Sequence, residues 1–304
     1  MAKPKLKPLN EQVIVITGAS SGIGLATAET AAAKGAKVVI AARSEETSKE
    51  IVDRITANGG EALFVACDVS DRAQVEDVAR ATVEHFGRID TWVNNAGQGM
   101  YARLDEVTEE DSRRLFDINF WGVVNGSLAA LPHLKKQGGA LINIGSEVSD
   151  AYVPLLGMYV ASKHAVKGFN DTLRVEIEDV DQAPVSITLI QPTATDTPFP
   201  QHARNYQDKE AKLPEPQDDP QDVADAILEA AVKPTRYKRV GATAVINTVT
   251  SKFAPGLADK MAAKQVDAQH YDERPRNPDG ALNQPSEATG VAGQTHGTGG
   301  KKPK

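Results

Sequence analysis

Short apolar runs alternate with longer amphipathic segments along the first two thirds of the chain. The apolar runs are rich in β-branched residues and predict six strands, at Val13–Thr17, Lys37–Ala41, Ala62–Ala66, Thr91–Asn94, Ala140–Ile144 and Val185–Ile190. The amphipathic segments predict helices, at Gly22–Lys34, Ser44–Ala57, Arg72–Phe86, Glu109–Lys136 and Met158–Val180. Because these strands are apolar throughout rather than alternating, the pattern indicates an α/β fold, with helices on both faces of a doubly wound parallel sheet.

The pattern changes after the sixth predicted strand. Residues 191–220 are rich in Pro, Asp and Gln, and a loop of this length is typical of a lid over a site, with a flexible surface excursion as the alternative. Ala224–Val232 then predicts a helix, and Arg239–Gly241 predicts an edge strand. We therefore expect four parts, which are an N-terminal arm (1–10), a dinucleotide-binding and catalytic domain (11–243), a helical extension interrupted at Pro255 (244–265) and a weakly ordered tail with almost no large apolar residues (266–304).

A glycine-rich turn joins the first predicted strand to the first predicted helix. It reads Thr17-Gly18-Ala19-Ser20-Ser21-Gly22-Ile23-Gly24. The N–H groups and the positive dipole end at a helix start attract phosphate, and glycines let the backbone approach it closely. A tight strand-to-helix turn is the plain alternative. The position at the first β–α junction favours a dinucleotide pyrophosphate, held by Gly18, Ser20, Ser21, Gly22, Ile23 and Gly24.

The end of the second predicted strand bears on the identity of the dinucleotide. A fold that binds NAD usually presents an acid there, which accepts a hydrogen bond from the ribose 2′-OH. Ala42 stands at that place in this chain, and Arg43 follows it. A guanidinium can pair with a 2′-phosphate through forked, charge-assisted hydrogen bonds, although a solvated arginine at a helix start is the alternative. We therefore expect NADP(H), with NAD(H) less favoured.

Tyr159 and Lys163 are four residues apart in a predicted helix, so their side chains share one face about one turn apart. A nearby ammonium favours the phenolate and is expected to lower the tyrosine pKa. Ser146 follows the strand Ala140–Ile144, at the strand end where sites of parallel sheets gather. Its hydroxyl can hydrogen-bond a substrate oxygen on which negative charge develops. Each residue alone has a structural explanation, but together they predict a site for proton and hydride transfer.

With Tyr159-Val160-Ala161-Ser162-Lys163, the chain resembles the short-chain dehydrogenase/reductase family over about residues 11–200. The motifs that carry the resemblance are Thr17–Gly24, Asn94-Asn95-Ala96-Gly97, Asn119 within Asp117-Ile118-Asn119, and Ser146 with Tyr159 and Lys163. The resemblance implies a Rossmann-type fold and an NAD(P)-dependent enzyme. Such an enzyme would interconvert a carbonyl and a secondary alcohol, with Tyr159 as the proton donor or acceptor.

The same resemblance implies roles for further residues. Asn119 would help to hold a water that connects Lys163 to solvent, and Tyr159 and Lys163 would contact the nicotinamide ribose. The other cofactor contacts implied are Asp68 at the adenine, with Val69, Asn95, Ala96 and Gly97 lining the cofactor. The segment after the sixth strand departs from the family's Pro-Gly pattern, because Thr193 stands in place of the glycine and has less freedom at positive φ. Either Thr195 or Thr197 could contact the nicotinamide carboxamide.

Composition excludes several other classes of protein. The chain has 304 residues and a net charge of −7, which argues against a broad nucleic-acid-binding surface. A single cysteine, Cys67, excludes an internal disulfide, and the six histidines show no metal-ligand spacing. We find no convincing targeting signal and no stretch of about 20 apolar residues. We therefore expect a cytoplasmic enzyme that acts on a small-molecule carbonyl or alcohol, without a metal, as the homodimer or homotetramer that the resemblance implies.

Two other functions remain open on the sequence alone. One is a catalytically weak NADP(H)-binding sensor or scaffold. The other is a membrane-peripheral reductase for a lipid-like ketone, anchored by the apolar segment Ala244–Ala263. The substrate is not specified; candidate pocket residues are Glu147, Val148, Tyr152, Gln98, Tyr101 and the loop 191–220.

Overall fold

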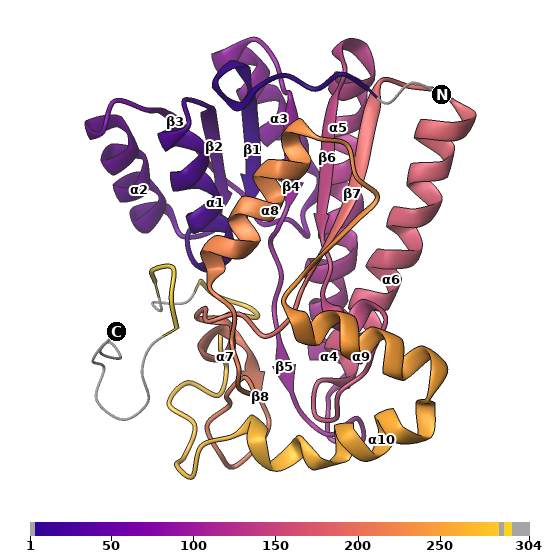
Figure 1. The fold of residues 1–304 in the computed structure, drawn as a ribbon. Helices are drawn as coiled ribbons and strands as arrows, with labels where there is room; N and C mark the ends of the chain where they lie inside the picture. The colour runs from indigo at the N-terminus through magenta and orange to yellow at the C-terminus, as the bar shows by residue number, and fades with distance from the viewer. Residues whose placement is uncertain (1–3, 286–288, 294–304) are drawn as a thin grey trace.

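Seven parallel strands form the central sheet of the computed structural model, which describes residues 4–285 and 289–293 (Figure 1). The strands are β1 (Val13–Thr17), β2 (Lys37–Ala42), β3 (Glu61–Ala66), β4 (Thr91–Asn94), β6 (Gly139–Ile144), β7 (Val185–Pro192) and β9 (Tyr237–Val240). Their order in the sheet is β3-β2-β1-β4-β6-β7-β9. Strands are therefore added toward one edge of the sheet from β1 to β3 and toward the other edge from β4 onward. Ligands of open α/β sheets bind at the carboxyl ends of the strands beside such a switch in strand order, here between β1 and β4.

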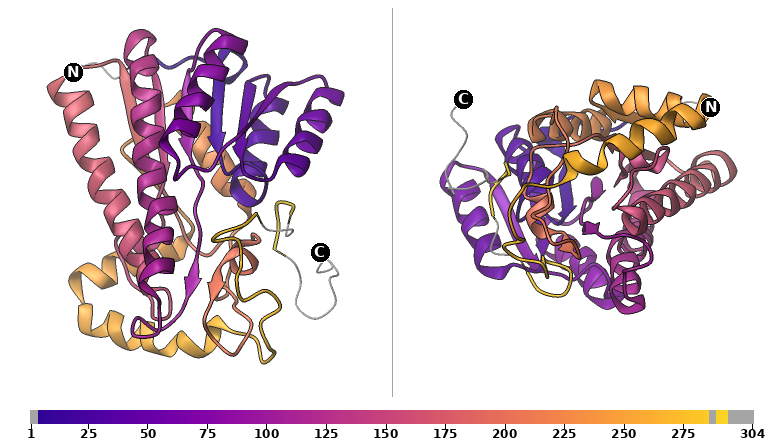
Figure 2. Two further views of the ribbon diagram at one scale, coloured as in Figure 1. Left: turned by 180° about the vertical axis from the view of Figure 1, so that it is seen from behind. Right: turned by 90° about the horizontal axis from the view of Figure 1, so that it is seen from below.

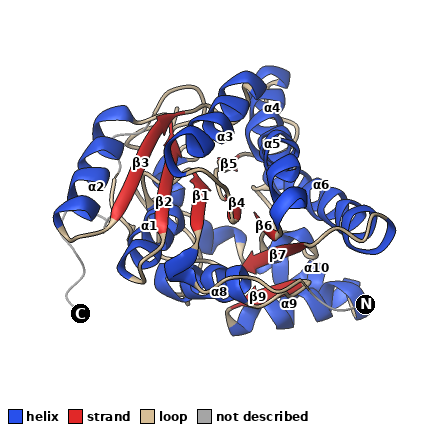
Figure 3. Cartoon of the chain, turned by 90° about the horizontal axis from the view of Figure 1, so that it is seen from above, coloured by secondary structure: helices blue, strands red, loops and turns tan. Residues whose placement is uncertain are grey.

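Helices cover both faces of the sheet (Figures 2 and 3). One face carries α1 (Gly22–Ala33), α2 (Glu45–Ala57) and α8 (Pro220–Val232). The other carries α3 (Arg72–Phe86), α4 (Glu109–Phe116), α5 (Gly122–Gln137) and α6 (Gly157–Arg174). The central strands are buried on both sides, and this double burial accounts for their apolar sequences. The predicted doubly wound α/β fold is confirmed.

The six predicted strands agree with the structure to within two residues, but the two longest predicted helices are each modified by a π-helical turn. Between α4 and α5 lies the π-helical turn Asp117–Trp121, and α6 runs into another at Val175–Val180. Such turns carry a wider hydrogen-bonding pattern and are often found at functional sites. The apolar spacing continues through both turns, so the sequence pattern alone did not reveal them.

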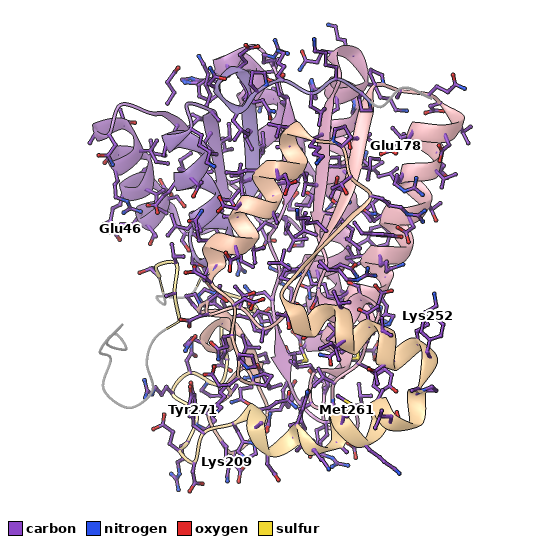
Figure 4. The ribbon with its side chains drawn as sticks, in the orientation of Figure 1. Glu46, Glu178, Lys209, Lys252, Met261 and Tyr271 are labelled. Carbon is purple, nitrogen blue, oxygen red and sulfur yellow. The ribbon has the colours of Figure 1, made fainter. Side chains whose placement is uncertain are left out.

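The carboxyl ends of the strands are covered by later parts of the chain. The loop 191–220 contains a short helix, α7 (Phe199–His202), and a short strand, β8 (Arg204–Asn205), which pairs with β5 (Met100–Tyr101). Beyond it lie α9 (Ala242–Phe253) and α10 (Pro255–Lys264), which meet at the predicted proline interruption. Figure 4 shows Met261 at this end of the molecule and Glu178 at the opposite end.

The described part of the C-terminal tail is packed against the body, in contrast to the weak order expected for residues 266–304. It begins with a 3₁₀ turn, Val266–Gln269, and the Leu282 side chain is fully buried in the same core cluster as residues of β1, β2, α3 and α5. Main-chain hydrogen bonds join it to the loop 191–220, with Ala281 N–H donating to His202 O at 2.7 Å. Buried side chains, main-chain pairing and ion pairs with the body hold this segment, and composition reveals none of these contacts. Residues 286–288 and 294–304 lie outside the described residues.

Candidate active site

Ser146, Tyr159 and Lys163 come together beyond the carboxyl end of β6. Ser146 is the second residue after the strand and begins the 3₁₀ turn Glu147–Ser149, while Tyr159 and Lys163 lie on one face of the first turns of α6. The hydroxyl of Ser146 hydrogen-bonds the phenol of Tyr159. The ammonium of Lys163 lies 5.7 Å from the centroid of the tyrosine ring and donates to Ile144 O at 2.9 Å. The structure thus brings together the three residues that the sequence grouped.

Burial sets the protonation of this pair. It raises the pKa of Tyr159 to about 12, with the Glu147 carboxylate adding to the rise and the Ser146 hydrogen bond opposing it. It also lowers the pKa of Lys163 to about 8. The expected lowering of the tyrosine pKa by Lys163 is therefore not found. The cost of burying a phenolate outweighs the attraction of an ammonium that is bonded to the Ile144 carbonyl.

Asn119 lies in the π-helical turn and ties three segments together. Its amide group pairs with the main chain of Gln98, accepting from N–H at 2.8 Å and donating to the carbonyl at 2.9 Å. It also donates to Ser162 Oγ at 3.0 Å, and Ser162 donates in turn to Tyr159 O at 2.7 Å. The side chain thus fixes the Gln98 turn against the start of α6. This bracing was not predicted for Asn119.

A buried network of asparagines lies behind the site and was also missed from the sequence. Asn94, at the end of β4, donates to Asn143 Oδ1 on β6 at 2.8 Å, and Asn143 donates to Asn170 Oδ1 on α6 at 3.0 Å. Trp92 Nε1 donates to Asn94 Oδ1 at 2.8 Å. A buried asparagine in an apolar strand needs hydrogen-bond partners. Asn94 and Asn143 in predicted strands were therefore the sequence signal from which this network could have been predicted.

A first cavity runs along the carboxyl ends of β1, β2 and β4. Twelve predicted cofactor-binding residues line it: Gly18, Ser20, Ser21, Gly22, Ile23, Arg43, Asp68, Val69, Asn95, Ala96, Gly97 and Thr197. Gly18 and Gly22 have positive φ, +66° and +53°, as the tight turn requires. The glycine turn, the open helix start and the position at the strand reversal fit a dinucleotide.

Four predicted cofactor residues do not line this first cavity: Gly24, Thr195, Tyr159 and Lys163, of which the last two line the second cavity. A side chain at Gly24 would place its Cβ 2.3 Å from Gly18 O, so this glycine serves the close packing of α1 on the turn. Thr195 lies on the second cavity, and its hydroxyl donates to Thr193 O at 2.9 Å. Thr193 itself does not have a positive φ, and its N–H donates to Val240 O, so the chain here continues the pairing of β7 with β9.

The charged groups of the first cavity are already engaged with other parts of the chain. Arg43 donates to Ala281 O at 2.5 Å and to Leu282 O at 3.4 Å. Asp68 forms an ion pair with Arg114 at 2.5 Å and accepts from Ser70. Burial acts to raise the pKa of Asp68, but the hydrogen bonds from Ser70 and Arg114 outweigh it, and the pKa lies below its usual value.

Tyr159 lines a second cavity, which adjoins the first at Ile23, Asn95 and Gly97. Its wall includes the predicted residues Glu147, Val148 and Tyr152, with apolar side chains from α10 and the loop 191–220, Met261, Phe199 and Leu213 among them. Phe199 packs edge-on against Tyr159, with ring centroids 5.3 Å apart. Glu147 accepts from Asn247 Nδ2 of α9 at 2.9 Å, and burial raises its pKa despite the bonds from Asn247 and Thr193.

Two other candidate pocket residues lie elsewhere. Tyr101 is fully buried in the core, where burial raises its pKa, and it is not a wall residue of either cavity. Its place in the short strand β5 turns the side chain inward, so the prediction for it was wrong. Gln98 lines the first cavity rather than the second.

Cys67 is the single cysteine of the chain, and it lines the first cavity. Cys67 is buried, and burial raises its pKa to about 12, so its thiolate is scarce at neutral pH. Within residues 4–285 and 289–293, no three or more His, Cys, Asp or Glu side chains are grouped to hold a metal ion. In the same part of the chain, every helix is too short or too polar to span a membrane.

Comparison with solved structures finds the same fold in other proteins. A short-chain dehydrogenase/reductase from Burkholderia phymatum in complex with NAD superposes with a TM-score of 0.75 and 28% identity, covering 83% of this chain and 96% of that one. An alcohol dehydrogenase from the archaeon Thermococcus sibiricus, complexed with 5-hydroxy-NADP, has a TM-score of 0.66 and 31% identity, covering 75% and 94%.

Sequence comparison agrees with the structural one. An uncharacterized oxidoreductase, YxnA, of Bacillus subtilis (strain 168) is 45% identical over 279 residues, which are 91% of this chain and 78% of that protein. An uncharacterized oxidoreductase of Staphylococcus epidermidis is 31% identical over 77% of this chain and 95% of its own length. The family model for short chain dehydrogenases matches residues 12–208. With the Ser146, Tyr159 and Lys163 cluster at the end of β6, these matches show that the chain is an oxidoreductase that belongs to the short-chain dehydrogenase/reductase family.

Proposed function

We propose that the protein is an NADP(H)-dependent enzyme that interconverts a carbonyl and a secondary alcohol, with Tyr159 as the proton donor or acceptor. The supporting observation is that the two cavities adjoin next to the reactive residues. Ile23, Asn95, Gly97 and Phe199 line both cavities, and Phe199 packs against Tyr159. The second cavity is also lined by Ser146, Tyr159 and Lys163. A dinucleotide in the first cavity and a carbonyl in the second would therefore share a boundary beside the phenol of Tyr159.

The protein groups have complementary roles in this proposal. A bound nicotinamide supplies or accepts the hydride, and the residues that line the first cavity would hold it. Tyr159, with a pKa of about 12, keeps its proton at neutral pH and can donate it to the substrate oxygen during reduction. Ser146 donates a hydrogen bond to the same oxygen, and Lys163, with a pKa of about 8, carries positive charge behind the phenol at pH 7.

The choice of NADP(H) rests on Arg43. Its guanidinium lies on the wall of the first cavity at the end of β2, where Ala42 leaves no carboxylate for a ribose 2′-OH. A 2′-phosphate would meet a cation there rather than an acid. One solved relative was bound to 5-hydroxy-NADP and another to NAD, so the family accommodates both kinds of cofactor.

The second cavity supports an apolar substrate. Met261, Phe199 and Leu213 contribute apolar wall, and Glu147 contributes a carboxylate next to Ser146. We propose a bulky, largely apolar ketone or the corresponding secondary alcohol, handled in the cytoplasm. The side of the molecule that carries α5 and α6 exposes Trp121, Leu128 and Val175, and this apolar surface supports a homodimer or homotetramer in solution.

Exposed apolar residues on α9 support a second candidate, a reductase that collects a lipid-like ketone at a membrane surface. Ile246, Val249 and Phe253 are exposed, Phe253 by 76%. In that case the protein should co-sediment with anionic phospholipid vesicles at low salt, and Phe253→Ser should weaken the association. Recovery of the wild-type protein only in the supernatant would exclude this membrane-surface function.

Turnover of a carbonyl panel tests the main proposal. We expect NADPH oxidation by the wild-type protein, and we expect Tyr159→Phe to bind NADPH equally well, by fluorescence titration, while losing at least about 100-fold in rate. Tyr271→Phe, outside both cavities, is the control and should be unchanged. Equal NADPH binding by wild type and Tyr159→Phe with no turnover by either would favour the sensor, and equal turnover by both would exclude Tyr159 as the proton donor.

Arg43→Ala tests the cofactor preference. Losing charge-assisted hydrogen bonds to a 2′-phosphate should weaken NADPH binding roughly 10-fold to 100-fold. NADH, which has no such phosphate, should bind with much the same affinity to both proteins. An equal loss for the two cofactors, or wild-type activity with NADH alone, would overturn the assignment to NADP(H).

A further inference from the structure

The C-terminal part of the chain returns across the molecule to the first cavity, which is called the dinucleotide cavity from here on. We name residues 278–285 the anchor and residues 289–293 the tip. The anchor is firmly held, because Leu282 is fully buried and Asn205 N–H donates to Pro278 O at 2.8 Å. Asp279 also pairs with Arg204 at 2.5 Å. The anchor is therefore part of the folded body.

The anchor forms a wall of the dinucleotide cavity at the Arg43 end. Ala281 and Pro285 line the cavity, and the carbonyl groups of Ala281 and Leu282 accept from Arg43. Arg114, the ion-pair partner of Asp68, donates to the carbonyl of Leu282 at 3.3 Å. The cationic end of the cavity is thus held in place by main-chain oxygens from a segment about 240 residues later in the chain.

The tip reaches the phosphate-binding turn at the other end of the cavity. Gly290 O accepts a hydrogen bond from Gly22 N–H at 2.8 Å, and Gly22 is the first residue of α1. Gly293 N–H donates to Asp196 Oδ1 at 3.2 Å, and Thr289 lines the cavity. The tip carbonyl therefore lies where the free N–H groups of the helix start would meet an anion.

A carbonyl oxygen and a phosphate oxygen compete for the same donor. The carbonyl is neutral, whereas a phosphate gains the charge-assisted bond and the attraction of the helix dipole. We propose that the tip covers the phosphate-binding turn in the free protein and leaves it when the dinucleotide binds, while the anchor stays in place. This proposal rests on the dinucleotide-dependent function proposed above. The tip is thus a built-in competitor of the dinucleotide pyrophosphate.

Competition of this kind multiplies the association constant for NADPH by the fraction of molecules in which the turn is open. One hydrogen bond of ordinary net strength corresponds to a change of roughly threefold to tenfold. Loss of the tip contact should therefore tighten NADPH binding by about that factor, chiefly through faster association.

A substitution in the full chain tests this without removing residues. Gly290 has φ +97°, which a β-branched side chain rarely adopts, although no atom lies within 4 Å of its Cβ position. We expect Gly290→Val to displace the tip and to raise the NADPH association rate in stopped-flow fluorescence. Gly59→Val is the matched control, because Gly59 also has a positive φ, +82°, and open surroundings, in the turn between α2 and β3. A chain ending at residue 288 should behave like Gly290→Val, and one ending at residue 293 like wild type.

Hydrogen exchange of the free protein gives a readout that needs no cofactor. The Gly22 amide should exchange faster in Gly290→Val than in wild type or Gly59→Val. Unchanged exchange and unchanged association rates would overturn the proposal, and so would weaker NADPH binding with faster dissociation, which would make the tip a clasp. If neither the wild-type protein nor any variant binds NADPH, both the proposed function and the competition are wrong. Hydrogen exchange could still show the contact between Gly22 and Gly290 in that case, so the two failures can be told apart.

Discussion

At the residue scale, Glu147 places a carboxylate beside the tyrosine of the candidate site. It is the residue after Ser146, and its charge raises the pKa of Tyr159 in addition to the larger effect of burial. Asn247 and Thr193 hold the carboxylate by hydrogen bonds. The negative charge keeps the phenol protonated, which suits reduction and opposes oxidation of an alcohol.

Glu147→Gln should therefore lower the pKa of Tyr159. Oxidation needs the phenolate, so the rise of kcat/KM for alcohol oxidation should move to lower pH, and the fall of kcat/KM for reduction should move the same way. The measurement is a pH profile in both directions. Glu110→Gln on the exposed surface of α4 should leave both profiles unchanged. If Glu147→Gln changes KM but leaves the pH profile of kcat/KM at the same pH, then Glu147 contacts the substrate and does not set the pKa of Tyr159.

The residues of the site were partly predictable from local spacing. Tyr159 and Lys163 share a helix face because of their four-residue separation, and Ser146 follows a visible strand. The effect of Glu147 was not predictable, because it depends on burial under α9, about 100 residues later in the chain. The burial of Tyr159 itself reversed the expected direction of its pKa.

At the scale of elements, α5 packs against β4 through a glycine. A Cβ at Gly126 would lie 1.9 Å from Asn94 Oδ1 and 2.8 Å from Trp92 Nε1, so the helix approaches the asparagine network only because this position lacks a side chain. The network in turn joins β4, β6 and α6 directly behind the catalytic candidates.

Gly126→Ala should accordingly reduce the free energy of unfolding by roughly 2–4 kcal/mol, through overpacking and disruption of buried hydrogen bonds. Gly168→Ala is the comparison, because Gly168 is exposed on α6 with no atom within 4 Å of its Cβ position. That substitution should increase the free energy of unfolding by about 0.5–1 kcal/mol, because alanine has a higher helix propensity than glycine. Urea denaturation of both variants measures the difference, and equal effects would contradict the packing argument.

The elements themselves were largely predictable, because two-sided burial leaves continuous apolar runs in the strands. The two π-helical turns and the short strands β5 and β8 were not. A π-helical turn keeps the apolar spacing of the surrounding helix, and the two residues of each short strand are too few to show a period.

At the scale of the whole molecule, Leu282 joins the C-terminal segment to the central core. The side chain is fully buried and belongs to the core cluster that covers one face of the sheet, although it lies in a polar stretch of sequence. Weak order was expected there because composition averages over many residues, whereas Leu282 and a few hydrogen bonds and ion pairs hold this segment.

Leu282→Ala should cost about 2–5 kcal/mol of stability, as for other buried leucines. Leu257→Ala, at a side chain that is 54% exposed on α10, should change stability by no more than about 0.5 kcal/mol. Thermal unfolding should remain a single transition in both. A small loss for Leu282→Ala, or a separate early transition of the C-terminal segment, would show that the segment is not part of the core.

The course of the anchor and tip has a practical consequence for work with this protein. The described chain starts near the amino ends of the strands, where Lys7 pairs with Asp90 just before β4, and its last described residue bonds to Asp196 beyond the end of β7. A fusion partner attached directly after residue 293 would therefore be tethered close to the first cavity. One attached just before residue 4 would sit at the far end of the sheet, which makes that position the better handle for immobilising the protein with its cavities open.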